Sequence, residues 1–176
     1  MRYVLSREPR AMITRAAKIL LIAGIALFYT LVVFNNLTDF DSNYQFVHHV
    51  LSMDSTFEGN HGMWRALPSP TIHLVFYLSI IAWEFVTMVL LWLGVVHLAR
   101  CWGQSAVIFN KAKRIPVMAL TLSMLMWLVA FLSVGAEWFL MWQSRTWNGQ
   151  EAAFRMFTVV GVVFLILVQP EGETQP

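Results

Sequence analysis

Charged residues are scarce in this 176-residue chain, where Asp, Glu, Lys and Arg together make up 12% of the sequence. A soluble domain usually carries about a quarter charged residues, so the scarcity argues against a soluble globular protein. The single cysteine, Cys101, excludes a disulfide within the chain. No phosphate-binding glycine loop, G-x-S-x-G, C-x-x-C or c-type haem motif is present. The commonest nucleotide-dependent, hydrolytic and thiol-redox enzyme classes are therefore not indicated, and with a net charge of +2 we expect no nucleic-acid partner.

The chain has long apolar runs instead, and 58% of its residues are hydrophobic. A transmembrane helix needs about 20 mostly apolar residues. Four segments meet that need, at about 16–34, 72–98, 115–138 and 152–168. They predict an all-α membrane protein, a four-transmembrane-helix bundle over residues 16–168, with an N-terminal tail at 1–15 and a disordered tail at 169–176. The first run is longer than a signal-peptide core and has no small-residue cleavage site, so we expect it to be retained.

The Lys and Arg residues concentrate in the N-terminal segment and in the connection between the second and third helices. Such enrichment marks the cytoplasmic side of a membrane. Both termini are therefore predicted to be cytoplasmic, in a multi-pass protein of the bacterial inner (plasma) membrane. The basic residues are Arg2, Arg7, Arg10, Arg15 and Lys18 in the first segment, and Arg100, Lys111, Lys113 and Arg114 in the second.

The first connection on the opposite, periplasmic side is long, covering about residues 35–69. Connections of this length usually have structure or function of their own. Ser42 and Gln45 have the spacing of a helix capping box, and apolar residues follow at helical spacing. We expect a short amphipathic helix on the outer membrane surface, in a long structured first periplasmic loop. The apolar residues are Phe46, Val47, Val50 and Leu51.

The second helix carries an unusual stripe of ionisable residues. His73, Tyr77 and Glu84 fall within about 40° of one another on a helical wheel. Glu84 lies near the middle of the membrane at about 1.5 Å rise per residue. An ionisable group at that depth costs at least ~2.5 kcal/mol on insertion scales. Because packing alone does not require such a group, Glu84 is the residue we expect to matter chemically.

Charged residues also stand at the outer ends of the third and fourth helices. We expect Arg155 to pair with Glu137 or Glu151, at the level of His73 and Tyr77. One hypothesis is a pocket for an ion, a proton or a small polar ligand, formed by these residues with Glu84 at its floor. The other is an ion pair that only holds the bundle together.

Four tryptophans, Trp64, Trp138, Trp142 and Trp147, are predicted at the outer interface. Tryptophans commonly anchor a membrane protein at that level. The alternative is a stacked aromatic surface for a quinone, a lipid or a partner protein. The i, i+4 spacing of Trp138 and Trp142 predicts one shared face, onto which Trp147 could fold.

Metal and haem sites are not predicted. The periplasmic loop has ligand types suited to metals, but His48 and His49 point about 100° apart on a helix and no HExxH spacing occurs. His73 and His97 share one helix, so they cannot grip one haem. We therefore expect no metal and no cofactor. The candidate ligands considered were His48, His49, His61, Asp39, Asp41, Asp54 and Glu58.

Several stretches resemble a known bacterial family. The segment at 135–155 resembles the hallmark of the family called domain of unknown function 2165, described as predicted small integral membrane proteins. Its sequence is GAEWFLMWQSRTWNGQEAAFR. The similarity runs from about Leu31 to the fourth helix, and implies a four-helix inner-membrane protein without known catalytic residues. The other matching stretches are Asn36-Leu37-Thr38-Asp39, Phe46-Val47-x-His49-Val50, Met53-Asp54, Trp64-Arg65-Ala66 and the helix of Glu84.

The favoured prediction is a small inner-membrane protein of uncharacterised activity, acting as an accessory subunit or as a handler of a small ligand or ion in a polar pocket near the outer leaflet. Four helices rarely make a complete transporter, so besides membrane lipid we expect a larger membrane complex or a homo-oligomer as partner. One alternative is a membrane enzyme acting on a lipid or quinone, with Glu137 and His73 as acid–base groups. The other is a purely structural anchor.

Overall fold

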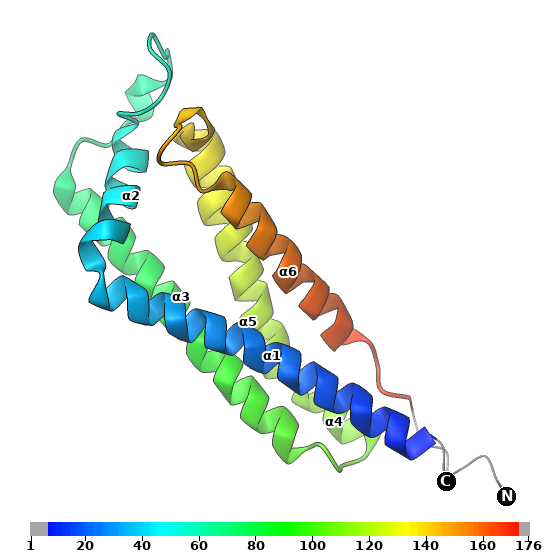
Figure 1. Ribbon diagram of the computed structural model, residues 1–176. Helices are drawn as coiled ribbons and strands as arrows, with labels where there is room; N and C mark the ends of the chain where they lie inside the picture. The colour runs from blue at the N-terminus through cyan, green and yellow to red at the C-terminus, as the bar shows by residue number, and fades with distance from the viewer. Residues whose placement is uncertain (1–6, 173–176) are drawn as a thin grey trace, which may run out of the picture.

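The computed structural model describes residues 7–172, and every regular element in that range is a helix (Figure 1). The elements are α1 (Arg7–Thr38), α2 (Phe40–Ser52), the 3₁₀ helix η1 (Met63–Arg65), α3 (Pro70–Arg100), α4 (Ala106–Ala112), α5 (Arg114–Leu125), the π-helix η2 (Met126–Trp138), the 3₁₀ helix η3 (Met141–Gln143) and α6 (Gln150–Val168). The stretches long and apolar enough to cross a membrane are Ala11–Thr38, Pro70–Arg100, Ala106–Trp138 and Gln150–Val168. The prediction of an all-α chain with four such helices is confirmed.

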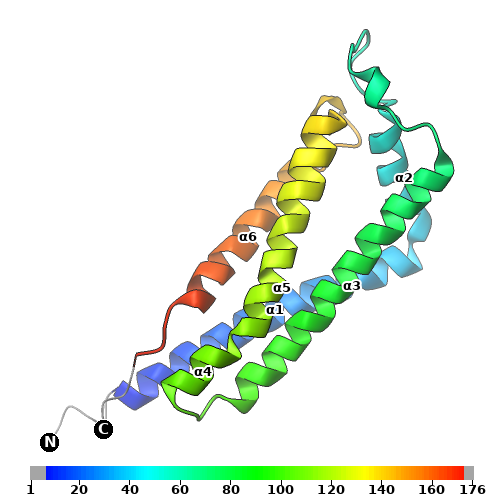
Figure 2. The ribbon, with the colours of Figure 1, turned by 180° about the vertical axis from the view of Figure 1, so that it is seen from behind.

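The four long helices run beside one another, and α2 lies across one end of them (Figures 1 and 2). Helix α3 packs against both α1 and α5, while α6 packs against α5 and η2. The short helix α4 lies at the opposite end, where α1 begins and the described chain ends. These two ends of the bundle are called the α2 end and the α4 end below.

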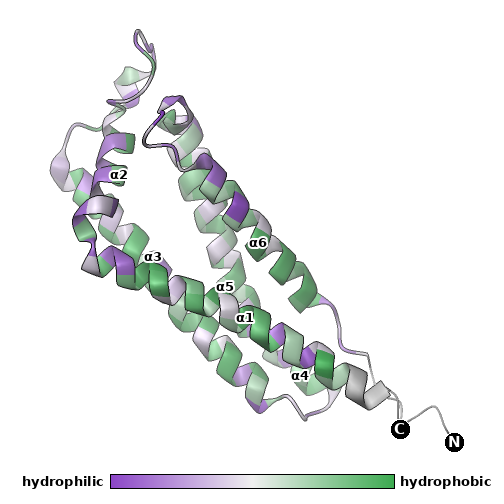
Figure 3. Cartoon of the chain, viewed as in Figure 1, coloured by the Kyte–Doolittle hydropathy of each residue, from purple (hydrophilic) through white to green (hydrophobic). Residues whose placement is uncertain are grey.

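Two clusters of buried apolar side chains hold the elements together. The larger one joins α1, α3, α5 and α6 through residues such as Leu91 and Val160. The smaller one lies at the α2 end and joins α2 to η2 and η3 through residues such as Leu51 and Met141. Figure 3 shows mostly hydrophobic residues along the long helices and hydrophilic residues gathered on α2. Many large apolar side chains remain exposed on the long helices, as expected where lipid tails cover them.

The predicted amphipathic helix is present as α2, but it begins earlier than predicted. Its first residue follows Asp39, whose side chain makes no capping hydrogen bond. Ser42 lies inside the helix and donates a hydrogen bond back to Asp39 Oδ1 at 2.8 Å. The predicted capping box of Ser42 and Gln45 is therefore wrong. Only Asp39 separates α1 from α2, so the helix has already begun before Ser42.

A close approach of α3 and α5 depends on Gly94. A Cβ atom added there would lie 2.8 Å from Cβ of Pro116. Small residues permit such contacts between membrane helices. We expect Gly94→Ala to lower the free energy of unfolding by about 1–3 kcal/mol, the usual cost of overpacking. Denaturant unfolding of the purified protein in detergent, followed by circular dichroism, measures this change.

Gly24→Ala is the matched control, because Gly24 lies in α1 and an added Cβ meets nothing within 4 Å. Alanine is the better helix former by about 1 kcal/mol, so this variant is expected to be as stable as the wild type or slightly more stable. Equal stability of the Gly94→Ala and Gly24→Ala variants would contradict the α3–α5 contact.

Candidate functional site

The ionisable stripe predicted on the second helix is confirmed. His73, Tyr77 and Glu84 all lie on the buried face of α3, and the Glu84 side chain is held inside the bundle at 4% exposure. This face follows the helical repeat of three or four residues, so the same spacing that buries apolar residues also buries the carboxyl group. The buried residues of α3 are His73, Tyr77, Ile81, Glu84, Thr87, Leu91, Gly94 and Leu98.

The partner of Glu84 is Asn36, a buried residue near the end of α1. Asn36 Nδ2 donates a hydrogen bond to Glu84 Oε2 at 2.6 Å. The Tyr77 hydroxyl donates to the backbone carbonyl of Asn36 at 3.2 Å and lies 3.4 Å from its Oδ1. The Asn36 amide thus connects the two predicted residues. We call Glu84, Asn36 and Tyr77 the Glu84 cluster.

The Glu84 carboxyl has no cationic partner within the described part of the chain. The ion pairs between residues 7 and 172 involve only the carboxylates of Glu171 and Asp54. A buried charge without a counter-charge is expensive, whereas a neutral carboxylic acid needs only hydrogen bonds. The Glu84 cluster therefore suits a carboxyl group in its neutral form better than one that stays permanently charged.

His73 belongs to a different set of contacts. Its ring is fully buried, and its Nε2 lies 2.6 Å from the backbone carbonyl oxygen of Leu67. Its Nδ1 lies 2.9 Å from Nδ1 of His48 on α2. The ring of Tyr44 lies between the two sets, 6.2 Å from His48 and 6.1 Å from Tyr77. The stripe on α3 therefore carries two polar sites, one against α1 and one against α2.

The predicted pairing of Arg155 with Glu137 or Glu151 is wrong. All three side chains are exposed, and no ion pair joins them among residues 7–172. Glu137 lies in η2, where hydrogen bonds such as Phe139 N to Val134 O span five residues. A π-helix turns less per residue than an α-helix, so the face that Glu137 occupies differs from the one that regular α-helical spacing would give.

Arg155 does not form the predicted ion pair because it lies away from the buried face of α6. The buried face of α6 includes Ala153, and Arg155 stands about 200° away from it around the helix. Glu137 and Glu151 do come together, at a shallow exposed depression between η2 and α6. Of the five residues predicted to form a polar pocket, the structure gathers three on the buried face of α3 and leaves Glu137 and Arg155 outside.

One hollow at the α2 end is apolar rather than polar. It has a volume of about 310 Å³ and lies between α2, α3 and η2. Ser79 lines it, but its hydroxyl already donates to the carbonyl of Val75 at 2.7 Å. Such a pocket suits a hydrocarbon chain. The lining residues are Phe46, Val47, Val50, Leu51, Phe76, Ser79, Ile80, Trp83, Val129, Ala130, Phe131, Val134, Gly135, Phe139 and Met141.

An ion-pair network that the sequence did not predict lies at the α4 end. Glu171 Oε1 lies 2.6 Å from Lys18 Nζ and 3.0 Å from Lys113 Nζ, and Oε2 lies 3.7 Å from Arg15 Nε. All four side chains are almost fully buried. Disorder was predicted from Gln169 onward, but the chain is fixed as far as Glu171 because its carboxylate neutralises three buried cations. Residues 173–176 lie outside the described range.

The environment of Glu171 shifts its acidity. Burial opposes ionisation of the carboxyl, but the hydrogen bonds from Lys18 and Lys113 outweigh burial and hold the pKa of Glu171 below its ordinary value of 4.5. Part of the positive charge at the α4 end therefore neutralises Glu171 inside the protein. These buried cations do not by themselves indicate on which side of the membrane this end lies.

The four interface tryptophans do not share one surface. Trp138 meets the ring of Trp64 edge to face, with centroids 5.8 Å apart, and Trp142 meets Phe57 at 5.7 Å. Trp147 stacks on the ring of His49 instead. The predicted common face of Trp138 and Trp142 is wrong, because η2 ends at Trp138 and the chain turns at Leu140, which has a φ of 54°.

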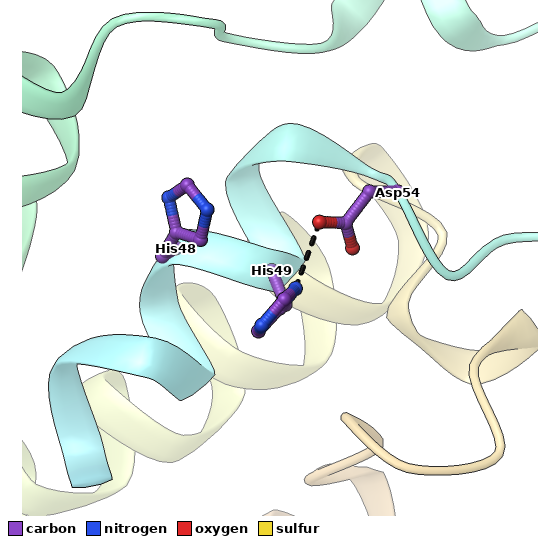
Figure 4. A group of neighbouring side chains, drawn as sticks. All are labelled: His48, His49 and Asp54. Carbon is purple, nitrogen blue, oxygen red and sulfur yellow. Dashed lines mark hydrogen bonds and ion pairs between the residues drawn. The ribbon is translucent and has the colours of Figure 1, made fainter.

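The end of α2 brings together residues that the sequence appeared to keep apart (Figure 4). One ring nitrogen each of His48 and His49 and one carboxylate oxygen of Asp54 lie within 4.8 Å of one another. His49 Nδ1 is 2.7 Å from Asp54 Oδ2. The two histidines therefore keep ligand atoms close together even though neighbouring helical positions point about 100° apart.

The four long apolar helices define the chain as a small multi-pass integral membrane protein. It belongs to the family of predicted small integral membrane proteins (DUF2165), which matches residues 14–170. The resemblance stated from the sequence is thereby confirmed. Comparison with curated proteins and with solved structures gave no match.

Proposed function

We propose that this protein handles protons, with Glu84 as the group that takes up and releases them inside the membrane. The observation that carries the proposal is the burial of Glu84 near the middle of a spanning helix against a neutral amide, with no ion pair among residues 7–172 to hold it charged. Ionisable side chains inside membrane helices commonly mark proton or ion pathways. A purely structural role would be served as well by apolar residues at both position 84 and position 36.

The Glu84 cluster supports this role through its hydrogen bonds. Asn36 can donate to either a carboxylate or the carbonyl oxygen of a carboxylic acid, so it stabilises Glu84 in both protonation states. Tyr77 holds the Asn36 amide in place from the α2 side. The cluster therefore keeps its geometry while the charge on Glu84 changes.

The small size of the bundle supports an accessory role. Four helices offer little room for a complete pathway, so the protein acts within a larger membrane complex or as a homo-oligomer. We place the α4 end on the cytoplasmic side of a bacterial inner membrane, because Lys and Arg residues are enriched on that side. Its exposed basic residues are Arg100, Lys111 and Arg114.

Complementation of a gene deletion tests the proposed function in the native membrane. The wild-type gene and the Glu137→Gln variant are expected to restore growth over the whole range of external pH, since Glu137 is exposed and unpaired among residues 7–172. The Glu84→Gln variant is expected to fail to restore it while accumulating normally in the membrane. Full restoration by Glu84→Gln would contradict the proposal.

A second candidate function is the binding of a lipid or quinone tail, favoured by the apolar hollow of about 310 Å³ between α2, α3 and η2. Known ligand pockets are largely apolar and measure about 300–1,000 Å³. Its lining reaches Trp83, next to Glu84 in the chain. Glu84 itself does not line the hollow, because its side chain faces Asn36 of α1.

The Ala130→Phe substitution tests this second candidate by filling the hollow. We expect extraction and mass spectrometry of the purified wild type to find one predominant apolar-tailed molecule, and the variant to lose about nine-tenths of it, which corresponds to ~1.4 kcal/mol of binding free energy. Ala152→Phe is the control, because Ala152 is exposed on α6 and lies away from the hollow. Equal retention by both variants would exclude the hollow as the binding site.

A further inference from the structure

We propose that His48, His49 and Asp54 form a binding site for a divalent transition-metal ion of the Zn²⁺ type at the α2 end. One potential ligand atom from each residue lies within 4.8 Å of the other two (Figure 4). Tetrahedral zinc ligands stand at about 2.0–2.2 Å from the ion, which places them about 3.3–3.6 Å from each other. Rotation of the side chains would have to bring the three atoms closer together than the 4.8 Å within which they lie.

The hydrogen bonds of His73 determine which nitrogen of His48 is free. A carbonyl oxygen only accepts, so His73 Nε2 must carry a proton to bond with Leu67 O at 2.6 Å. In a neutral His73 ring, Nδ1 is then the acceptor, and His48 Nδ1 must donate to it across 2.9 Å. A neutral His48 therefore keeps a lone pair on Nε2, which is the atom that would bind a metal ion.

His49 would bind the ion through the nitrogen that faces Asp54. Its Nδ1 lies 2.7 Å from the Asp54 carboxylate, which accepts the proton of that nitrogen. An ion shared with Asp54 would take the place of that proton on Nδ1, since only Nδ1 of His49 faces the carboxylate, and Nε2 would then carry the proton. Metal-binding histidines usually donate their other N–H to a carbonyl or a carboxylate, which orients the ring and raises its basicity. His48 is oriented before any ion arrives by the hydrogen bond between its Nδ1 and His73.

The backbone and the neighbouring rings also fix the three residues. Met53, at the end of α2, has a φ of 55° and turns the chain so that Asp54 comes back towards His49. The ring of His49 stacks on Trp147, with centroids 4.5 Å apart. His48 packs against the fully buried His73. The site is thus assembled from α2, its C-terminal turn, α3 and the segment before α6.

The ligand chemistry selects the class of ion. Two imidazoles and one carboxylate favour Zn²⁺ and similar transition metals over Mg²⁺ or Ca²⁺, which prefer oxygen ligands only. Three protein ligands leave a fourth position for water or another ligand, as in zinc sites that act chemically. Asp54 is exposed, so an ion can reach the site from solvent.

Titration of the chelator-treated, full-length protein in detergent with Zn²⁺ tests this inference. We expect one ion to bind per chain. Calorimetry measures the binding, and tryptophan fluorescence is expected to change with it, because Trp147 stacks on the proposed ligand His49. Asp54→Asn and His49→Gln each remove a proposed ligand, so each is expected to weaken binding by more than the about 10–100-fold found when only the support of a ligand is lost. His61→Ala is the control, because His61 is exposed in the same segment but outside the cluster.

Circular dichroism of each variant shows whether its helices are intact, and both substitutions lie at partly or fully exposed positions that tolerate change. Binding by the wild type and His61→Ala with loss in the other two supports the site. Absence of binding by the wild type would overturn the inference, and so would equal affinity in all four proteins, because the ion would then be held elsewhere.

Discussion

The Glu171→Gln substitution is expected to lower the free energy of unfolding by about 3–5 kcal/mol, the usual cost of breaking a buried ion pair from one side. The carboxylate of Glu171 contacts Lys18, Lys113 and Arg15, all of them almost fully buried. Glutamine keeps the size of the side chain and removes its charge. Three buried cations would then face one another with no anion among them.

Denaturant unfolding in detergent measures the effect, with Glu151→Gln as the control, because Glu151 is exposed and forms no ion pair within residues 7–172. Combining Glu171→Gln with Lys113→Met is expected to recover part of the lost stability, since one of the unpaired cations is gone. Additive losses in the double variant would show that the network is not coupled.

The free energy of unfolding is expected to depend on pH through the carboxyl group of Glu171. Because the pKa of Glu171 is lower in the folded protein than its ordinary value of 4.5, its contribution is complete above that value and is lost as the pH falls through the lowered pKa. The wild type should therefore lose stability as the pH falls below about 4.5, the ordinary carboxyl value. In Glu171→Gln this part of the acid-induced loss is expected to be missing, which unfolding curves recorded at several acidic pH values would show.

The Glu84→Gln substitution is expected to act in the opposite way, removing function while sparing the fold. The amide oxygen of glutamine can still accept the hydrogen bond from Asn36. The free energy of unfolding should therefore change by less than about 1 kcal/mol. The variant cannot exchange a proton at this position, so all proton uptake by the Glu84 cluster is expected to disappear.

Glu84→Leu distinguishes the hydrogen bond from the proton. Leucine leaves Asn36 Nδ2 buried without its partner, which typically costs about 1–3 kcal/mol. Both variants should lack proton uptake, but only Glu84→Leu should be less stable. If Glu84→Gln were as unstable as Glu84→Leu, the carboxyl group would serve the packing of α1 against α3 rather than proton exchange.

The elements of the fold that depend on one segment at a time could be predicted from the sequence. Apolar runs gave the four long helices, and helical spacing placed His73, Tyr77 and Glu84 on one buried face of α3. Both signals repeat within a single helix. The partner of Glu84 could not be predicted, because Asn36 is on α1. The residue pattern within one helix does not determine which of its residues lie opposite a given residue of another helix.

Two other failures have different physical causes. The prediction for Glu137 used only its level at the outer end of the third helix, and that level does not determine which face of η2 carries the side chain. The tail was predicted to be disordered from its polar composition, although Glu171 forms three ion pairs. Composition describes an average tendency, whereas a single carboxylate among three buried cations is enough to fix a segment.

The infrared spectrum of the protein in lipid bilayers, recorded as a difference between acidic and alkaline pH, tests the central claim most directly. The carbonyl stretch of a protonated carboxylic acid is separate from that of a carboxylate, and comparison with Glu84→Gln isolates the signal of Glu84. We predict that the wild type loses a protonated-carboxyl band on going to alkaline pH and that Glu84→Gln lacks this band. Identical difference spectra for the two proteins would contradict proton exchange at Glu84.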